Sequence, residues 1–383
     1  MFNGQVLKEL RLLNGLSRAE LAQKMGLTEQ AIWQFESNTT QPKLETRLQL
    51  AHQFAVDLMY FEQDEEVAHF DTSAIVFRNA DLVTRKTMDI QRAYLHKIDK
   101  FIDYLEQFVM IPNETIYELS RQTNQDYQAG KAIEDIALYT RDFLKISADN
   151  QDVLYKLERS GIYIAERIIN GQADAYSAWS KSDRPFIILG TNKSAVRRNF
   201  DLAHELGHLL LHKSQDKDED LESLEREANY FASCFLLPKA EFLEDFEKRV
   251  GSRISNPDSY ASLKANRQVS IQALEYRAFK LGLLTPQQHA YLYRQIAKKG
   301  YKIVEPLDME ILVKKPSKVR SILDVIFSHN LISLPALLTQ QKVRKQFISD
   351  LFAFDVSFFD KYQDKQSVES FANIIPLNRK HIR

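Results

Sequence analysis

The pentapeptide His204-Glu205-Leu206-Gly207-His208 constrains the fold of this 383-residue chain more than any other feature. Two histidines four residues apart share one face only if the segment is α-helical, and both imidazoles then reach a single metal ion. Glu205 would stand beside the open position of that metal, where a general base activates water. The HExxH pattern therefore predicts a helix with a catalytic metal site, which needs one more protein ligand.

The same helix offers further signals. Asp201 is a candidate N-cap, because a short acidic side chain accepts hydrogen bonds from the first free N–H groups of a helix. His212 is the nearest candidate for a third ligand, but it lies about 12 Å from His204 along a straight helix. We therefore expect His212 beside the site and not in it. A second helix, expected over residues 221–237, carries Glu225 and Asn229 on one face.

The first sixty residues contain several capping residues and glycines that are typical of helix starts and ends. A first helix ends at Gly15, and Ser17 with Glu20 forms a capping box that opens a second helix. Gly26 suits the tight turn after it, and Thr28 can cap a third helix that runs to about residue 37. Two short helices joined by a glycine turn predict a helix-turn-helix motif.

The segment Leu16–Thr28, with Ile32, Glu36 and Pro42, is similar to the XRE (lambda-repressor-like) family. The resemblance implies a five-helix DNA-binding domain over residues 1–64 and a double-stranded DNA operator as its partner. Glutamine side chains suit adenine edges, and arginine suits guanine or phosphate. Carried onto this chain, the family's groove-facing positions fall on Arg18, Glu29, Gln30, Gln34 and Asn38.

The charge of the first domain argues against extensive contacts with DNA phosphates. Residues 1–62 hold six Lys/Arg and seven Asp/Glu, and the whole chain has a formal net charge of −1. Few phosphate contacts are therefore expected, and Glu29 would repel phosphates unless it accepts from a cytosine. A helix-turn-helix used for dimerisation or for protein contacts remains an open alternative.

The segment Glu225–Ala232, with Leu236-Leu237-Pro238 after it, resembles the ImmA/IrrE metallopeptidase family of the gluzincin type. The similarity covers about residues 131–284. It implies that Glu225 completes a zinc site with His204 and His208, and that Glu205 is the catalytic base. Glu227 is the alternative third ligand, and manganese or iron would fit similar ligands.

Several supporting roles stay open at this point. Asn229, one turn beyond Glu225, can orient a metal ligand. Tyr230, His212 or Arg197 can donate to the oxyanion, and the sequence does not choose among them. The acidic loop over residues 213–222 is either a solvated linker or a feature that favours basic substrates.

The rest of the chain predicts a mainly α, α+β protein. Residues 65–130 are expected to form a helical connecting region. It includes a helix over Leu82–Met110 whose apolar stripe packs in its own domain or forms a dimer seam. Further helix is expected over residues 113–146. Strands are expected at Ile162–Ala165 and Phe186–Leu189, and an edge strand beside the metal helix can hold an extended substrate.

Residues 285–383 predict a helical C-terminal region of unknown function. Its apolar run Ile322–Phe327 and its cluster of phenylalanines near residue 355 are expected to pack in a core. A basic cluster of Lys314, Lys315, Lys318 and Arg320 is expected to be solvated.

Composition and cysteine usage predict the setting. The single cysteine, Cys234, can form no internal disulfide, which is typical of a reducing cytoplasm. No signal peptide is evident, and no apolar run approaches the ~20 residues of a membrane-spanning helix. The two resemblances imply a cytoplasmic regulator that cuts a repressor-type protein, or itself, in stress or mobile-element control, and a homodimer is possible. The alternative is a non-enzymatic regulator or antitoxin-like binder whose peptidase domain only docks a partner.

Overall fold

The computed structural model describes residues 1–63, 75–77, 85–112, 114–167, 175–213, 220–362 and 375–376. Helices predominate and a small sheet lies among them, so the predicted mainly α, α+β fold class is confirmed. The elements before the metal helix are α1 (Gly4–Leu13), α2 (Arg18–Met25), α3 (Glu29–Glu36), α4 (Leu44–Gln53), the 3-10 helix η1 (Leu58–Glu62), β1 (Ile75–Phe77), α5 (Arg85–Glu106), β2 (Val109–Met110), α6 (Glu114–Gln128), α7 (Ile133–Leu144), α8 (Val153–Ser160), β3 (Tyr163–Arg167), β4 (Ala175–Trp179) and β5 (Pro185–Gly190).

The later elements surround and follow the metal helix. They are α9 (Ala195–Leu211), α10 (Leu221–Leu236), α11 (Lys239–Arg249), η4 (Pro257–Tyr260), α12 (Ala261–Arg267), α13 (Ile271–Lys280), α14 (Pro286–Lys298), α15 (Lys318–Ser328), α16 (Leu334–Gln341), α17 (Lys345–Phe352), η5 (Val356–Tyr362) and β6 (Ile375–Pro376). No helix among the described residues is long and apolar enough to cross a membrane.

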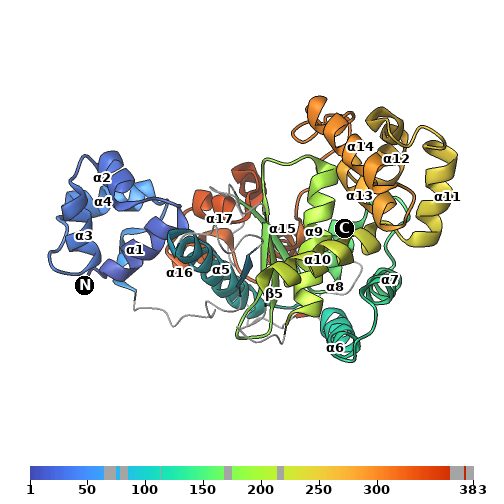
Figure 1. Ribbon diagram of the computed structural model, residues 1–383. Helices are drawn as coiled ribbons and strands as arrows, with labels where there is room; N and C mark the ends of the chain where they lie inside the picture. The colour runs from blue at the N-terminus through green and yellow to red at the C-terminus, as the bar shows by residue number, and fades with distance from the viewer. Residues whose placement is uncertain are drawn as a thin grey trace.

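The N-terminal module forms as its local signals predict. Ser17 and Glu20 make the reciprocal hydrogen bonds of a capping box at the start of α2. Gly26 ends α2 in the left-handed conformation, and the Thr28 side chain caps α3. The module consists of four α-helices followed by η1, and it forms a distinct group at one end of the molecule (Figure 1).

A four-stranded sheet lies at the centre of the rest of the chain, in the order β1-β4-β5-β3. β3 and β5 are parallel, whereas β4 runs antiparallel to both β5 and β1. The two predicted strands correspond to β3 and β5, and the sequence reasoning missed β1 and β4. Both faces are buried: Tyr163 and Phe186 belong to one hydrophobic core, and Ile164 and Ile187 to the other.

The apolar stripe of α5 packs inside its own chain. Tyr94, Ile98, Phe101 and Leu105 are all at most 3% exposed, in the same core as α15, α17 and one face of the sheet. The dimer-seam interpretation of this stripe is therefore wrong. The segment 113–146 also differs from one continuous helix, because Gly130 adopts a positive φ of 77° between α6 and α7.

The C-terminal region is divided between the two cores. Helix α14 buries Leu292 and Ile296 in the core that contains α9 and α10, whereas α15, α16 and α17 join the core of α5. Residues 322–327 of α15 are buried except for Asp324, which confirms the expected packed helix. Lys318 corrects the prediction of a solvated basic cluster, because it is 1% exposed and its Nζ lies 4.0 Å from the Tyr163 ring centroid.

The N-terminal module is attached directly to the C-terminal region. The amide of Asp57 donates to the carbonyl oxygen of Lys342 (2.7 Å), and the amide of Arg344 donates to that of Ala55 (2.9 Å). Val56 and Val343 form an isolated antiparallel bridge between these bonds. In Figure 1, α5, α16 and α17 accordingly lie between the N-terminal helices and the sheet.

Candidate functional site

The helix that carries the HExxH motif begins earlier than the sequence predicts. Helix α9 starts at Ala195 after Ser194, six residues before the predicted cap Asp201. Asp201 is buried in the middle of α9, where its carboxylate pairs with Lys193 Nζ at 2.6 Å. The prediction that Asp201 caps the helix is therefore wrong, because α9 begins at Ala195 and Asp201 lies inside it.

Glycine at the centre of the motif lets α10 approach α9 closely. A Cβ atom at Gly207 would lie 3.1 Å from Phe231 Cδ1 and 3.4 Å from Ala228 Cα, both on α10. Leu206 and Phe231 are fully buried in the core around this contact. The close packing brings Glu225 on α10 to the face of α9 that carries the two histidines.

Three potential metal ligands converge at this contact. His204 Nε2 and His208 Nε2 are 3.1 Å apart, and the Glu225 carboxylate oxygens lie 3.4 and 3.2 Å from them. Two donor atoms each about 2.1 Å from a tetrahedral zinc ion lie about 3.4 Å from one another. His204, His208 and Glu225 are the group of three ligands that the described part of the chain brings together, and their spacing fits zinc.

A hydrogen bond behind each histidine sets its tautomer. Asn229 Oδ1 lies 3.1 Å from His204 Nδ1, so Nδ1–H donates to it and Nε2 keeps its lone pair for a metal. His208 Nδ1 lies 2.9 Å from His212 Nδ1, and His212 Nε2 lies 3.2 Å from Glu227 Oε2. With His208 donating to His212, the Nε2–H of His212 donates to Glu227.

Burial and neighbouring groups shift the pKa values of His212 and Glu225. Burial, with His208 close by, lowers the pKa of His212 to about 4, so this imidazole is neutral near pH 7. Burial opposes ionisation of Glu225, but its contacts with the His204 and His208 imidazoles outweigh this effect and lower its pKa to about 2. The site therefore offers two imidazole nitrogens and one carboxylate, which is a donor set suited to zinc.

Glu227 and Tyr127 extend this network outward. Tyr127 on α6 donates to Glu227 Oε2 at 2.6 Å, and its ring packs edge-on against His212. Glu227 thus lies beyond His212 and is not among the three converging ligands, so its alternative role as third ligand is not supported. Sequence reasoning missed Tyr127, which lies 85 residues before His212 without any local motif.

The general-base candidate is buried within the same helix. Glu205 is 2% exposed, and its backbone oxygen accepts a 3.3 Å hydrogen bond from Ser177 Oγ on β4. Trp179 Nε1, also on β4, donates to the backbone oxygen of Leu209. Strand β4 therefore lies directly against the metal helix.

The three oxyanion candidates have different surroundings. Tyr230 donates its hydroxyl to Glu134 on α7, and burial raises the pKa of Tyr230 to about 12. His212 is held between His208 and Glu227. Arg197 donates to the backbone oxygen of Tyr301, and it lines a cavity of about 390 Å³ together with Asp201 and Asn229. Of the three candidates, only Arg197 lines this cavity. Asn229, which contacts His204 Nδ1, is part of the same lining.

The predicted DNA-contacting residues lie in and around the helix-turn-helix. Glu29 and Gln30 are exposed in the first turn of α3, and Gln34 is half-buried one turn later. Arg18 Nε pairs with Glu36 Oε2 at 2.7 Å, and the buried Arg11 pairs with the same carboxylate. Asn38 Oδ1 accepts from the amide of Gly4. Arg18 and Asn38 therefore also hold the module together.

Only the ends of the acidic loop over residues 213–222 belong to the described part of the chain. Residues 214–219 lie outside the described part of the chain, as does the acidic stretch at residues 64–66. The described flank of the loop includes Asp220 and Glu222, which pair with Arg226 on α10.

Comparison with known families agrees with both halves of this description. Residues 7–61 match the helix-turn-helix family, and residues 157–279 match the IrrE N-terminal-like domain. The chain is thus a fusion of an XRE-type helix-turn-helix domain to an ImmA/IrrE-like metallopeptidase-type domain. A search of curated proteins gives no match to the chain.

Proposed function

We propose that this fusion protein is a DNA-binding transcriptional regulator with a zinc-dependent endopeptidase domain. Its substrate would be a repressor-type protein or the chain itself, in stress or mobile-element control. The observation that carries the proposal is the convergence of His204, His208 and Glu225, whose ligand atoms all lie within 4.8 Å of one another.

Different residues of the site would have different roles in peptide hydrolysis. His204, His208 and Glu225 would hold the metal, while Asn229 and His212 fix the two imidazole rings. Zinc, when bound, polarises a carbonyl group and lowers the pKa of water. Glu205 would accept the proton of the attacking water and return it to the leaving amine.

The arrangement of β1 favours the chain's own linker as a substrate. Residues 75–77 pair antiparallel with β4, with Val76 opposite Ser177, and Ser177 contacts the metal helix. Strand addition beside a site is a common way to hold an extended peptide. Along the described residues, β1 therefore occupies the position in which a substrate strand would pair with β4.

Cleavage near β1 would separate residues 1–63 from the catalytic half. The DNA-binding module would then lose its covalent link, and the remaining contacts at residues 55–57 would have to hold it in place. Such a cut would couple proteolysis to promoter occupancy within one molecule.

DNA recognition would rest on the exposed first turn of α3. Gln30 and Gln34 suit adenine edges, and Glu29 suits a cytosine amino group. Because Arg11 and Arg18 are both used by Glu36, few cations remain for phosphates, and we expect a weak dependence of binding on salt. Binding as a homodimer to two half-sites would compensate for the small number of contacts in each module.

The test is incubation of the purified full chain with zinc, with mass analysis of the products. We expect a cut within residues 64–84, or in a regulator encoded beside the chain, that Glu205→Gln abolishes. Operator binding that survives with no cleavage of either target, and that is indifferent to Glu225→Ala, would instead establish the non-enzymatic alternative. In an electrophoretic shift assay, Gln30→Ala with Gln34→Ala should remove the specific band. If the band remains, the helix-turn-helix does not read DNA through α3.

A further inference from the structure

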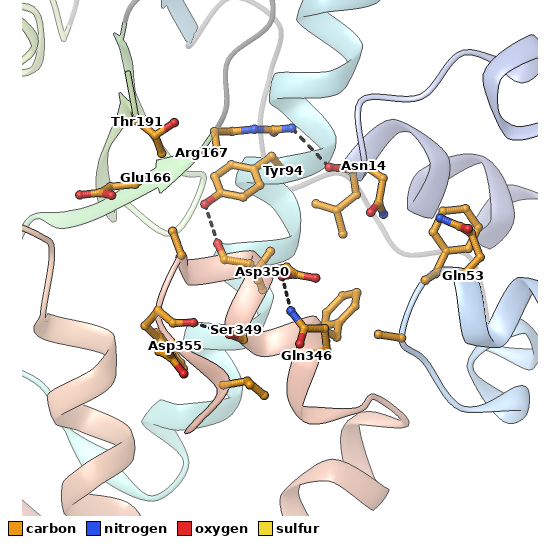
Figure 2. Close-up of a pocket in the computed structure, with 18 of the residues that line it drawn as sticks. Asn14, Gln53, Tyr94, Glu166, Arg167, Thr191, Gln346, Ser349, Asp350 and Asp355 are labelled. Atoms are coloured by element: carbon orange, nitrogen blue, oxygen red, sulfur yellow. Dashed lines mark hydrogen bonds between the residues drawn. The ribbon is translucent and has the colours of Figure 1, made fainter. Parts of the chain in front are cut away.

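A cavity of about 780 Å³ lies where three parts of the chain meet. The N-terminal module contributes Leu13, Asn14 and residues 52–55, and the C-terminal region contributes residues 346–356. The end of β3 and Tyr94 on α5 complete the lining (Figure 2). This volume is in the range of sites that bind small organic molecules. The cavity is distinct from the metal centre, none of whose ligands line it.

Arg167 provides the main polar feature of this cavity. Its guanidinium carbon lies 4.4 Å from the centroid of the Tyr94 ring, and Nη2 donates to the backbone oxygen of Leu13 at 3.3 Å. Nη1 is buried and makes no hydrogen bond within the described part of the chain, although the guanidinium interacts electrostatically with the Tyr176 hydroxyl. A buried charged donor without a partner is unfavourable, and a bound anion would satisfy it. The tyrosine ring below holds the planar guanidinium in one orientation.

The surrounding charges indicate which anion fits. Glu166 is 3% exposed and pairs with Arg198, so it does not cancel the charge of Arg167. Asp355 and Asp350 are exposed on the wall formed by residues 346–356, opposite the wall with Arg167 and Asn14 (Figure 2). These carboxylates would repel a polyanion such as a nucleotide, whereas a single carboxylate at Arg167 would stay clear of them.

The remaining lining is apolar and aromatic. Phe54, Phe347 and Leu351 are buried side chains that line the cavity, and Phe354 is half-buried beside them. Such walls accept a ring-sized apolar body, while a guanidinium fork suits a carboxylate in a bidentate pair. A molecule with one carboxylate and an aromatic body therefore matches both parts of the site.

The position of the cavity suggests what such a molecule would do. The backbone bonds that attach the N-terminal module, from Asp57 to Lys342 and from Arg344 to Ala55, lie beside the cavity. A ligand that contacts residues 52–55 and residues 346–356 together binds only the attached arrangement. It would therefore shift the population toward that arrangement.

We propose that this cavity binds a small aromatic monocarboxylate, that Arg167 pairs with its carboxylate, and that the bound molecule controls DNA binding by fixing the N-terminal module to the C-terminal region. The site does not depend on peptidase activity, so Glu205→Gln protein should bind the same molecule.

The experiment measures ligand binding to the full chain by isothermal titration and by thermal shift. The probes are benzoate and indole-3-acetate, with inorganic phosphate and ATP for comparison. We expect at least one of the two acids to bind and to raise the melting temperature, with no effect from ATP. Arg167→Gln should weaken the binding at least about tenfold, which is the loss expected for one charge-assisted pair. The matched control is Arg294→Gln on α14, an exposed position outside the cavity, and it should change nothing.

A second variant tests the site without removing a buried charge. Gln346 is exposed at the cavity lining, so Gln346→Trp should fill the opening and abolish binding while the protein stays folded. Gln287→Trp, at an exposed position of α14, is its control. The acid that binds should change the DNA-binding affinity of wild type at least threefold and that of Gln346→Trp not at all. Equal binding by wild type and both cavity variants would overturn the proposal, and so would the failure of both acids to bind wild type. Binding of phosphate or ATP instead would overturn the assigned ligand class.

Discussion

Replacement of Asn229 by alanine should weaken zinc binding without loss of a ligand. The Asn229 side chain accepts from His204 Nδ1 at 3.1 Å, which keeps the ring oriented and leaves Nε2 free for the metal. Removal of such a supporting contact typically lowers metal affinity 10- to 100-fold, or about 1.4–2.7 kcal/mol. Glu225→Ala, which removes a ligand itself, should have the larger effect.

Competition with a chromophoric chelator measures this affinity directly. Asn229→Asp should recover most of the lost affinity, because a carboxylate oxygen can accept the same hydrogen bond. Ser233→Ala is the matched control, since Ser233 lies one turn further along α10, is 2% exposed, and has a hydroxyl with no hydrogen-bond partner among the described residues. If Asn229→Ala binds zinc within twofold of wild type, or if Asn229→Asp is as weak as alanine, the supporting role of Asn229 is refuted.

Three further substitutions, and removal of zinc by a chelator, test other parts of the structure. Gly4→Ala should unfold the N-terminal module and abolish DNA binding while zinc affinity is unchanged, because a Cβ there would lie 2.0 Å from the backbone oxygen of Phe35; limited proteolysis and a shift assay check this. Glu36→Gln should destabilise the same module by about 3–5 kcal/mol in denaturant unfolding, since it leaves the buried Arg11 without its counter-charge. Burial lowers the pKa of Lys318 to about 7 from its usual 10.5, so its penalty is largest below pH 7 and disappears as the pH rises toward 10.5. Lys318→Met should therefore stabilise the protein by about 3–5 kcal/mol at pH 6 and progressively less at higher pH in thermal unfolding. Removal of zinc by a chelator should lower the melting temperature, and at a free zinc concentration 1,000 times the Kd the stabilisation lost is about 4 kcal/mol.

Local signals made the N-terminal module predictable. The Ser17 capping box, Gly26 and Thr28 each act through hydrogen bonds within a few residues, so their effect can be derived without knowing the fold. The HExxH pair is equally local, because helical spacing alone places His204 and His208 together. Glu225 needed the family resemblance, since nothing in the spacing of the chain shows that α10 packs against α9.

Non-local contacts account for what the sequence did not predict. Strand β4 has the sequence Ala-Tyr-Ser-Ala-Trp, which lacks β-branched residues and forms a strand because it is paired on both sides. Asp201 carries a capping residue type in the middle of a helix because Lys193 pairs with it. Lys318 looks like part of a solvated basic cluster until the fold places it over Tyr163. Each of these outcomes depends on a partner remote in the sequence or on tertiary burial.

The same limit applies to the roles around the metal site. Tyr230, His212 and Arg197 are equivalent as donors in the sequence, but their contacts differ in the fold. Tyr230 is bonded to Glu134 and His212 to Glu227, whereas Arg197 lines the cavity next to Asn229. Arg197 is thus the preferred candidate for contact with substrate, and Arg197→Ala should lower kcat/KM without loss of zinc.

Zinc content and peptide-bond cleavage, measured together on wild type and Glu205→Gln, decide whether the chain is a zinc-dependent endopeptidase. Elemental analysis and mass spectrometry of the same samples give both quantities. We expect about one zinc per chain in both proteins, since Glu205 is not a ligand, and peptide-bond cleavage in the wild type alone. A wild-type protein that binds no zinc, or a Glu205→Gln protein that cleaves as fast as wild type, would contradict the proposed function.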